Sequence, residues 1–278
     1  MSLVKRVILI LLDGLRPDGV AQAATPTLDR LVSTGAYSWQ ARAVMPSITL
    51  PCHASIFQAV PPSSHGVLDN VWAHETADAI PSLFDVAHQA GLGTAAFYSW
   101  EPLRDLARPG ALDFVYFRNH GKNVRRDFEQ KIGEVATEYI LAQQPACAFV
   151  YFGSPDLAGH HAGWMSEYYL QTVTLIDGIV GRLLDRVANA GLLAETACLL
   201  LADHGGQGKV HGSALAEDMT VPWILTGPGV RRGCQLSCPV SIMDTAPTLA
   251  YLLGLPRPAV WEGRVVRAAF EEQVADEI

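Results

Sequence analysis

The stretch "CLLLADHGGQGKVHG", residues 198–212, begins like a core strand and ends in polar side chains. Its first part, Cys198–Ala202, is fully apolar, as in a strand buried in the middle of a parallel sheet. Asp203 and His204 follow at once, and His211 comes seven residues after His204. A polar turn after a strand would explain these residues as well as a functional site would. The rest of the chain has to separate the two interpretations.

Strand and helix patterns alternate along the whole chain, without a linker or a repeat. Such alternation predicts a largely parallel central β-sheet with helices on both faces, which is an α/β fold. We therefore expect a single domain over residues 1–278, with the acidic end 271–278 frayed. The expected strands are Val7–Leu12, Gly93–Tyr98, Ala146–Phe152, Cys198–Ala202 and Val221–Leu225, and the expected helices are Pro26–Leu31 (capped by Thr25), Pro81–Ala90, Phe128–Ala142, Ser166–Ala190 and Asp244–Leu253.

Composition excludes several classes of protein. With 49% hydrophobic and 17% charged residues, the chain can bury a large core. A net charge of -8 argues against binding to a nucleic acid polymer. The five cysteines are odd in number and irregularly spaced, which favours a reducing, cytoplasmic location. The apolar run Val7–Leu12 is too short to span a membrane, and no signal-peptide cleavage site follows it, so we expect no membrane association.

Two other expected strands also end in carboxylate or imidazole side chains. Asp13 directly follows Val7–Leu12, and Asp156 and His160 follow Ala146–Phe152. In open parallel sheets, ligands bind beyond the carboxyl ends of the strands, which lie at one edge. We therefore expect these side chains to converge with the polar residues of the opening stretch.

Local spacing agrees with convergence. Asp156 and His160 are four residues apart, which places them on one face of a helical turn, whereas His161 is one position off that face. Asp203 and His204 are adjacent and would point to opposite sides in a regular strand. The two glycines that follow them free the backbone, so that both can turn toward one centre.

The resulting set holds three aspartates and three histidines and no thiolate. Oxygen and imidazole ligands of this kind suit Zn²⁺ or Mn²⁺. Six are too many for one catalytic zinc ion that keeps an open position. They fit two metal ions about 3.5–4 Å apart, an arrangement used in phosphoryl transfer.

A hydrolase of this type needs a nucleophile, and "MPSITLPCHAS", residues 45–55, offers three: Ser47, Thr49 and Cys52. A hydroxyl is a weak nucleophile until a metal or a base lowers its pKa. Thr49 also fits as a helix cap, so the residues alone leave the choice open. Of the other histidines, we expect His53 to pack beside the nucleophile, His65 to support a turn, and His120 and His161 to lie at the surface or behind the ligands.

Five blocks, in this order, resemble the alkaline phosphatase superfamily: "ILLDGLRPD", "MPSITLPCHASI", "SSHGVLDN", "YFGSPDLAGHH" and "ADHGGQGKVHG". They are most similar to its nucleotide pyrophosphatase/phosphodiesterase branch, with phosphonoacetate hydrolase as the next relative. "TGPGV" at 226–230 continues the likeness. The resemblance implies an alkaline-phosphatase-like domain with little or no cap.

The resemblance also implies a division of the ligands between two divalent ions, zinc first and manganese as the alternative. It makes Thr49 both a ligand and the nucleophile that forms a phospho-threonine intermediate. Asn70 resembles the amide that holds a non-bridging phosphate oxygen. The residues similar to the ligands of one metal are Asp13, Thr49, Asp203 and His204, and those similar to the ligands of the other are Asp156, His160 and His211.

For the substrate, the resemblance implies a small phosphorylated molecule, cleaved at a phosphodiester or pyrophosphate bond of the nucleotide type. Tyr151 is similar to an aromatic residue that stacks on the nucleobase. Leu50 stands where nucleotide-cleaving relatives have Phe, which weakens that pocket because Leu has no π face. A homo-oligomer is compatible with the sequence.

The alternative on the same site is a phosphonate hydrolase or a phosphomonoesterase. Relatives with those activities carry lysines that hold the extra substrate charge, but "FYSWEPLRDL" has Trp100 and Glu101 at this place, with Arg104 nearby. A nucleotide-binding module without catalysis is disfavoured, because the chain has neither G-x-G-x-x-G nor a Walker A loop.

Overall fold

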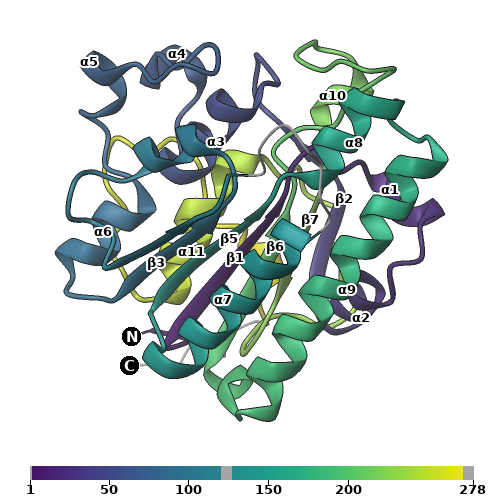
Figure 1. Cartoon of the computed structure of the whole chain (residues 1–278). Coiled ribbons are helices and arrows are strands. Elements are labelled where there is room, and N and C mark those ends of the chain that lie inside the picture. Colours follow the sequence, from purple (N-terminus) through teal and green to yellow (C-terminus); the bar gives the residue numbers. More distant parts are fainter. Residues whose placement is uncertain (1, 120–126, 272–278) are drawn as a thin grey trace.

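An eight-stranded sheet forms the centre of the molecule (Figure 1). The computed structural model describes residues 2–119 and 127–271. Strand β7 pairs antiparallel with β6 and β2, and the other pairings of the described strands are parallel, which confirms the expected α/β class. The strands in their spatial order are β4 (Phe114–Phe117), β3 (Thr94–Tyr98), β5 (Cys147–Phe152), β1 (Arg6–Leu12), β6 (Thr196–Leu201), β7 (Thr220–Thr226), β2 (Ala36–Arg42) and β8 (Cys234–Gln235).

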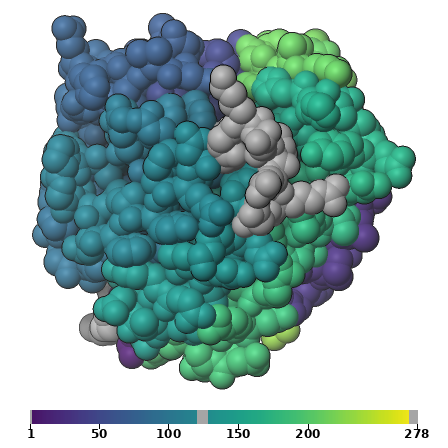
Figure 2. All heavy atoms as spheres, viewed as in Figure 1, coloured from purple at the N-terminus to yellow at the C-terminus, as the bar shows by residue number. Residues whose placement is uncertain are grey.

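Helices cover both faces of the sheet. One layer holds α7 and α9 with α1, α2 and α8, and the other holds α3, α6 and α11 (Figure 1). The side chains of the first layer cover the sheet in the space-filling view (Figure 2). The helices are α1 (Pro17–Gln22), α2 (Pro26–Thr34), α3 (Thr49–Gln58), α4 (Pro62–His65), α5 (His74–Ala77), α6 (Leu83–Gln89), α7 (Asp127–Gln143), α8 (Ser154–Ala162), α9 (Glu167–Asn189), α10 (Ala216–Met219) and α11 (Thr245–Leu252), with short 3-10 turns at Glu101–Leu106, Leu192–Glu195, Ile242–Asp244 and Arg267–Ala269.

The three central strands, β5, β1 and β6, position the site. Every residue of these strands is buried, because helices pack on both faces, and this explains their continuous apolar sequences. Their register places Leu12 opposite Phe152, and Leu11 opposite Leu201. The residues that follow the three strands therefore start at the same level of the sheet, as the sequence predicts.

The sheet differs from the expected one at its margin. The expected strand Val221–Leu225 is β7, and it runs antiparallel. The strands β2, β4 and β8 are not among the expected ones. Polar residues interrupt the apolar sequence of β2, β4 has only four residues and none is buried, and β8 has only two residues. Thr25 occupies the N-cap position of α2, but its hydroxyl donates to the carbonyl of Val20 instead of capping the helix.

The expectations for the chain ends, the membrane and the cysteines can be compared with the described residues. His120 and the acidic segment 272–278 lie outside the described residues. Among the helices within 2–119 and 127–271, none has the length and apolar character needed to cross a membrane. All five cysteines are free thiols, and Cys52, Cys147 and Cys198 are buried.

Candidate active site

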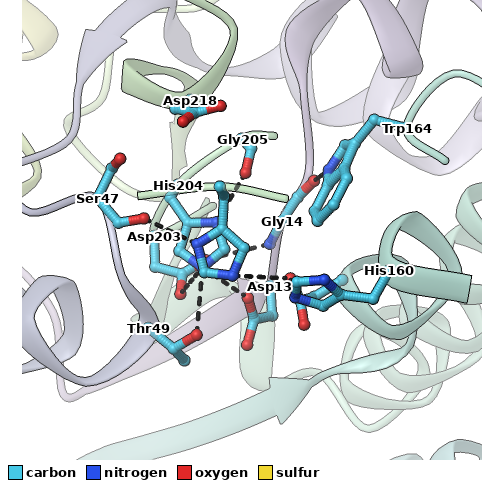
Figure 3. Close-up of polar contacts among 12 residues, drawn as sticks. Asp13, Gly14, Ser47, Thr49, His160, Trp164, Asp203, His204, Gly205 and Asp218 are labelled. Carbon is cyan, nitrogen blue, oxygen red and sulfur yellow. Dashed lines mark hydrogen bonds and ion pairs between the residues drawn. The ribbon is translucent and has the colours of Figure 1, made fainter. Parts of the chain in front are cut away.

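Three side chains converge where β1 and β6 end, and we call Asp13, Asp203 and His204 the buried ligand set. The Nε2 atom of His204 lies 3.3 Å from Asp13 Oδ1 and 3.4 Å from Asp203 Oδ2. The three side chains are at most 2% exposed. Figure 3 shows them pointing toward one another and toward Thr49. The structure thus brings together three residues that the sequence predicts to lie close to one another.

A second group lies beside the first, and we call Asp156, His160 and His211 the outer ligand set. Asp156 Oδ1 is 3.4 Å from His160 Nε2 and 3.6 Å from His211 Nε2. Asp156 and His160 lie on α8, in the helical spacing that the sequence indicates. The neighbouring ring of His161 packs against Tyr168 instead.

The two sets adjoin each other. The rings of His204 and His211 stack with their centroids 3.8 Å apart. Asp156 offers a ligand atom within 4.8 Å of Asp13 and His204 as well as of its own set. Asp156 thus stands between the two groups.

The three histidines present their Nε2 atoms to the site, because their other ring nitrogen is occupied. The Nδ1–H groups of His160, His204 and His211 donate to backbone carbonyls at 2.9, 2.7 and 2.9 Å. In a neutral ring, such bonds place the proton on Nδ1 and turn the lone pair of Nε2 toward the site, which is the form that binds a metal ion.

The carboxylates of the two ligand sets are incompletely paired. Among the described residues, Asp13 Oδ1, Asp156 Oδ1 and Asp203 Oδ2 are buried without a hydrogen-bond partner. Burial, together with the charge of Asp156, raises the pKa of Asp203 to about 8. Burial and neighbouring carboxylates likewise raise the pKa of Asp13 and Asp156 well above their ordinary range. Buried carboxylates grouped in this way are stabilised when they coordinate metal ions, so the donor set fits a metal site.

Thr49 is the hydroxyl that reaches this centre. It is 6% exposed, begins α3, and places Oγ1 3.2 Å from His204 Nε2. The helix is preceded by Ile48 at the N-cap position, so Thr49 is not the cap. Ser47 donates to the carbonyl of Ser213, and Cys52 is fully buried with its pKa raised by burial, so neither competes with Thr49.

Two neighbours support Thr49. One turn later, His53 donates from Nδ1 to the Thr49 carbonyl at 2.8 Å, and burial lowers its pKa to about 3. The backbone N–H of Leu50 donates to Asn70 Oδ1 at 3.0 Å, which leaves the amide nitrogen of Asn70 free to donate. Asn70 is exposed and lines the same pocket as Thr49.

The structure corrects the expected roles of Tyr151 and Leu50. Tyr151 lines the pocket beside Thr49, but it is only 3% exposed and its hydroxyl donates to Asp13 Oδ2, so its ring offers little open surface to a nucleobase. Leu50 is fully buried, and only its backbone reaches Asn70. Both side chains lie in the packed core beneath the ligands. Sequence spacing does not reveal how deeply a residue is buried.

A pocket of about 130 Å³ opens over Thr49 and the outer ligand set. Ser99 and Trp100 line it, and Trp100 is half-buried. Among the described residues, no lysine or arginine lines this pocket. Arg104 instead pairs with Glu101 and Asp105 in a neighbouring cavity.

Sequence reasoning missed the residues that clamp the turn after β1. The carbonyl of Gly14 accepts hydrogen bonds from Trp164 Nε1 and from the Tyr169 hydroxyl, both at 2.9 Å. Gly14 has φ +68°, and a Cβ atom there would lie 2.9 Å from the Asp156 Cα atom. The clamping side chains follow 150 residues later in the chain, so no local pattern announces them.

The glycines after His204 have a different function from the expected one. A Cβ atom on Gly206 would lie 2.3 Å from the Trp164 ring, and one on Gly205 would lie 2.0 Å from the Glu217 carbonyl oxygen. Neither has a positive φ. They allow close packing, and it is the end of β6 that turns Asp203 and His204 toward one centre.

Known proteins resemble this chain in sequence and in fold. Rat ectonucleotide pyrophosphatase/phosphodiesterase family member 3 is 29% identical over 219 residues, which cover 72% of this chain and 24% of that protein. The chain therefore spans about a quarter of the length of such relatives. The solved structure of murine ectonucleotide pyrophosphatase/phosphodiesterase 5 superimposes with a TM-score of 0.77 at 16% identity, covering 91% of this chain and 96% of that one.

A phosphonate monoester hydrolase from Silicibacter pomeroyi shares the fold, with a TM-score of 0.72 at 16% identity over 95% of this chain and 76% of that one. Residues 7–215 match the family model for type I phosphodiesterase / nucleotide pyrophosphatase. This match includes β1 from Val7 onward, all of β5 and β6, and every residue of both ligand sets. The chain belongs to the type I phosphodiesterase / nucleotide pyrophosphatase family.

Proposed function

We propose that this chain hydrolyses phosphodiester or pyrophosphate bonds in small nucleotide-type substrates, using two divalent metal ions and Thr49 as the nucleophile. The observation that carries the proposal is the position of Thr49 Oγ1, 3.2 Å from His204 Nε2, where the two ligand sets meet. The murine neighbour is described as an inactive threonine-to-alanine variant in complex with AMP, which supports a threonine in this role.

The two ligand sets would each hold one ion. Zinc is our first choice and manganese the second, because the ligands are carboxylates and imidazoles. Divalent ions bound there would lower the pKa of the Thr49 hydroxyl and neutralise charge on the phosphoryl oxygens. The buried ligand set, next to Thr49, would serve the nucleophile, and the outer ligand set would serve the departing oxygen.

The chain's own residues would carry the remaining steps. Thr49 Oγ1 would release its proton to solvent and attack phosphorus, forming a threonine phosphoester while the bond to the leaving oxygen breaks and that oxygen takes up a proton from solvent. The amide nitrogen of Asn70 donates to a non-bridging oxygen, and the N-terminus of α3 favours negative charge at the same place. Water then cleaves the phospho-threonine, releasing the phosphorylated product and restoring the hydroxyl.

The pocket supports a diester preference. Its volume of about 130 Å³ suits a phosphoryl group rather than a whole nucleotide, so the rest of the substrate would extend past the rim. A monoester carries nearly one more negative charge than a diester, and no lysine or arginine among the described residues lines the pocket to meet it. Trp100 is the partly open ring there, and it would contact an aryl or base group.

A substrate panel on metal-loaded protein tests the proposal. We expect kcat/KM for bis(p-nitrophenyl) phosphate to exceed that for p-nitrophenyl phosphate by about 10²-fold, or about 2.7 kcal/mol of transition-state binding. If the monoester or phosphonoacetate is hydrolysed with the higher kcat/KM, the protein is a phosphomonoesterase or a phosphonate hydrolase and not a diesterase.

Metal analysis tests the other half of the proposal. Protein purified without chelator should contain about two transition-metal ions per chain, as a two-metal site requires. A content near zero, even after incubation with Zn²⁺ or Mn²⁺, would rule out the mechanism.

A further inference from the structure

A buried glutamate stands behind the outer ligand set. Glu129 lies on α7 and is 0% exposed. Its Oε1 atom accepts two hydrogen bonds from Ser154, one from the backbone N–H and one from the hydroxyl, both at 2.8 Å. Ser154 is the first residue of α8, the helix that carries Asp156 and His160. Glu129 thus joins two helices at the point where the ligand helix begins.

Helix α8 lacks a capping side chain of its own. Its N-cap residue is Gly153, which has no side chain, and Pro155 has no backbone N–H to offer. The first N–H groups of a helix need acceptors, which the N-cap side chain usually provides. Glu129 provides one from another helix, and a carboxyl group there is also favoured by the helix dipole.

Packing alone does not explain a carboxyl group at this position. Among the described residues, Glu129 Oε2 is buried without a hydrogen-bond partner, and burial raises the pKa of Glu129 to about 8 despite the bonds from Ser154. The next inward-facing positions of α7, Ile132 and Ala136, are apolar. Leucine would fill the position without the cost of burying a half-satisfied polar group. The carboxyl group therefore calls for a role beyond packing.

We propose that Glu129 is a positioning residue for the outer metal ion. By holding both polar groups of Ser154, it fixes the start and the rotation of α8, and so the directions of Asp156 and His160. These ligands lie two and six residues beyond Ser154 on the same short helix. The inference rests on the metal site proposed above.

Zinc titration of the full chain against a chromophoric chelator tests this role. The binding step that His160→Ala removes is assigned to the outer ligand set. Glu129→Leu should weaken that step by about 10–100-fold and leave the other step unchanged, as is typical when support behind a metal ligand is lost. Glu129→Gln keeps the Oε1 acceptor and should bind zinc within about threefold of wild type.

The matched control is Glu134→Leu, which removes a half-exposed glutamate from the same helix and should change neither step. Activity of the Glu129→Leu variant should recover at saturating zinc, because the missing function is positioning rather than contact with the substrate. Wild-type zinc affinity in Glu129→Leu, or equal damage in Glu129→Gln, would overturn the inference.

A second variant keeps the test decisive if Glu129→Leu does not fold. Ser154→Ala removes one of the two donors and should weaken the same binding step by a smaller factor, and an unchanged step would also overturn the inference. If the wild-type protein itself binds no zinc, the proposed metal site fails. If wild type binds zinc and the variants match it, only the role of Glu129 fails.

Discussion

The buried and outer ligand sets use the same residue types in opposite surroundings. The side chains of Asp13, Asp203 and His204 are 2%, 0% and 0% exposed, whereas those of Asp156, His160 and His211 are 14%, 43% and 9% exposed. The residues of the buried set lie at the ends of β1 and β6. The outer set comes from α8 and from the loop that follows β6.

This difference separates two tasks. Strand ends inside the core fix the buried ligands and exclude water, so the electrostatic interactions there are strong. Ligands on a helix and a loop at the surface leave room for a substrate to enter. We therefore expect the metal at the buried set to be held more firmly and to govern Thr49, and the metal at the outer set to exchange more readily.

The largest expected effect is at Thr49, which adjoins the buried set. Thr49→Ala should lower turnover by at least about 10⁴-fold while both metals stay bound, because the aspartates and histidines are untouched. Thr49→Ser should keep measurable activity, since it retains a hydroxyl. Steady-state kinetics with metal analysis would check both, and near-normal turnover of Thr49→Ala would mean that water attacks directly.

The second prediction compares the two sets directly. Asp203→Ala should lower activity by roughly 10³-fold and His160→Ala by roughly 10²-fold, each with loss of mainly one metal. In wild type, a chelator should remove the outer metal first. The control is His161→Ala, because His161 is adjacent to His160 but packs against Tyr168. If the chelator removed both metals at the same rate, the two ligand sets would not differ in how firmly they hold a metal.

The third prediction concerns the stability of the metal-free protein. Asp203 has its pKa raised from 3.8 to about 8, so the folded state binds a proton that the unfolded chain releases. This stabilisation is complete below 3.8 and is lost as pH rises through about 8. Between pH 6.5 and 8, Asp203 alone should remove roughly 2 kcal/mol of the free energy of unfolding.

Three histidines oppose this trend. The pKa values of His53, His65 and His211 are lowered to about 3, 4 and 3, so each adds roughly 0.4 kcal/mol to the free energy of unfolding between pH 6.5 and 8, as the unfolded imidazole loses its remaining proton. Chemical denaturation in EDTA at both pH values would measure the loss. Asp203→Asn should lose roughly 2 kcal/mol less than wild type between the two pH values. Part of the slope should stay, because the pKa values of Glu129, Asp13 and Asp156 are also raised. A slope unchanged in Asp203→Asn would contradict the assignment.

The smallest expected effect separates the roles of Trp100 and Tyr151. Trp100→Ala should raise KM for nucleotide diesters by about fivefold and change KM for methyl nitrophenyl phosphate less, because the nucleobase loses its contact with the open ring. Tyr151→Phe should leave KM unchanged and weaken metal binding at the buried set, because Asp13 loses its hydroxyl donor. A larger KM effect from Tyr151→Phe would restore the stacking role implied by family resemblance.

The ligands were predictable because each follows an apolar run that forms a central strand. Asp13 and Asp203 need only the rule that ligands gather beyond the carboxyl ends of parallel strands. Asp156 and His160 need only helical spacing. The choice of Thr49 over Ser47 and Cys52 came from family resemblance, and local chemistry did not provide it.

By itself, the sequence determined the α/β class, the three central strands and the residues at their ends, because hydrophobic periodicity and strand ends are local properties. Tertiary structure alone decided how deep each residue lies and what it faces. It buried Tyr151 and Leu50 beneath the ligands, brought Trp164 and Tyr169 onto Gly14, and set Glu129 against Ser154. These contacts join segments between 25 and 155 residues apart, and only the packing of helices onto the finished sheet creates them.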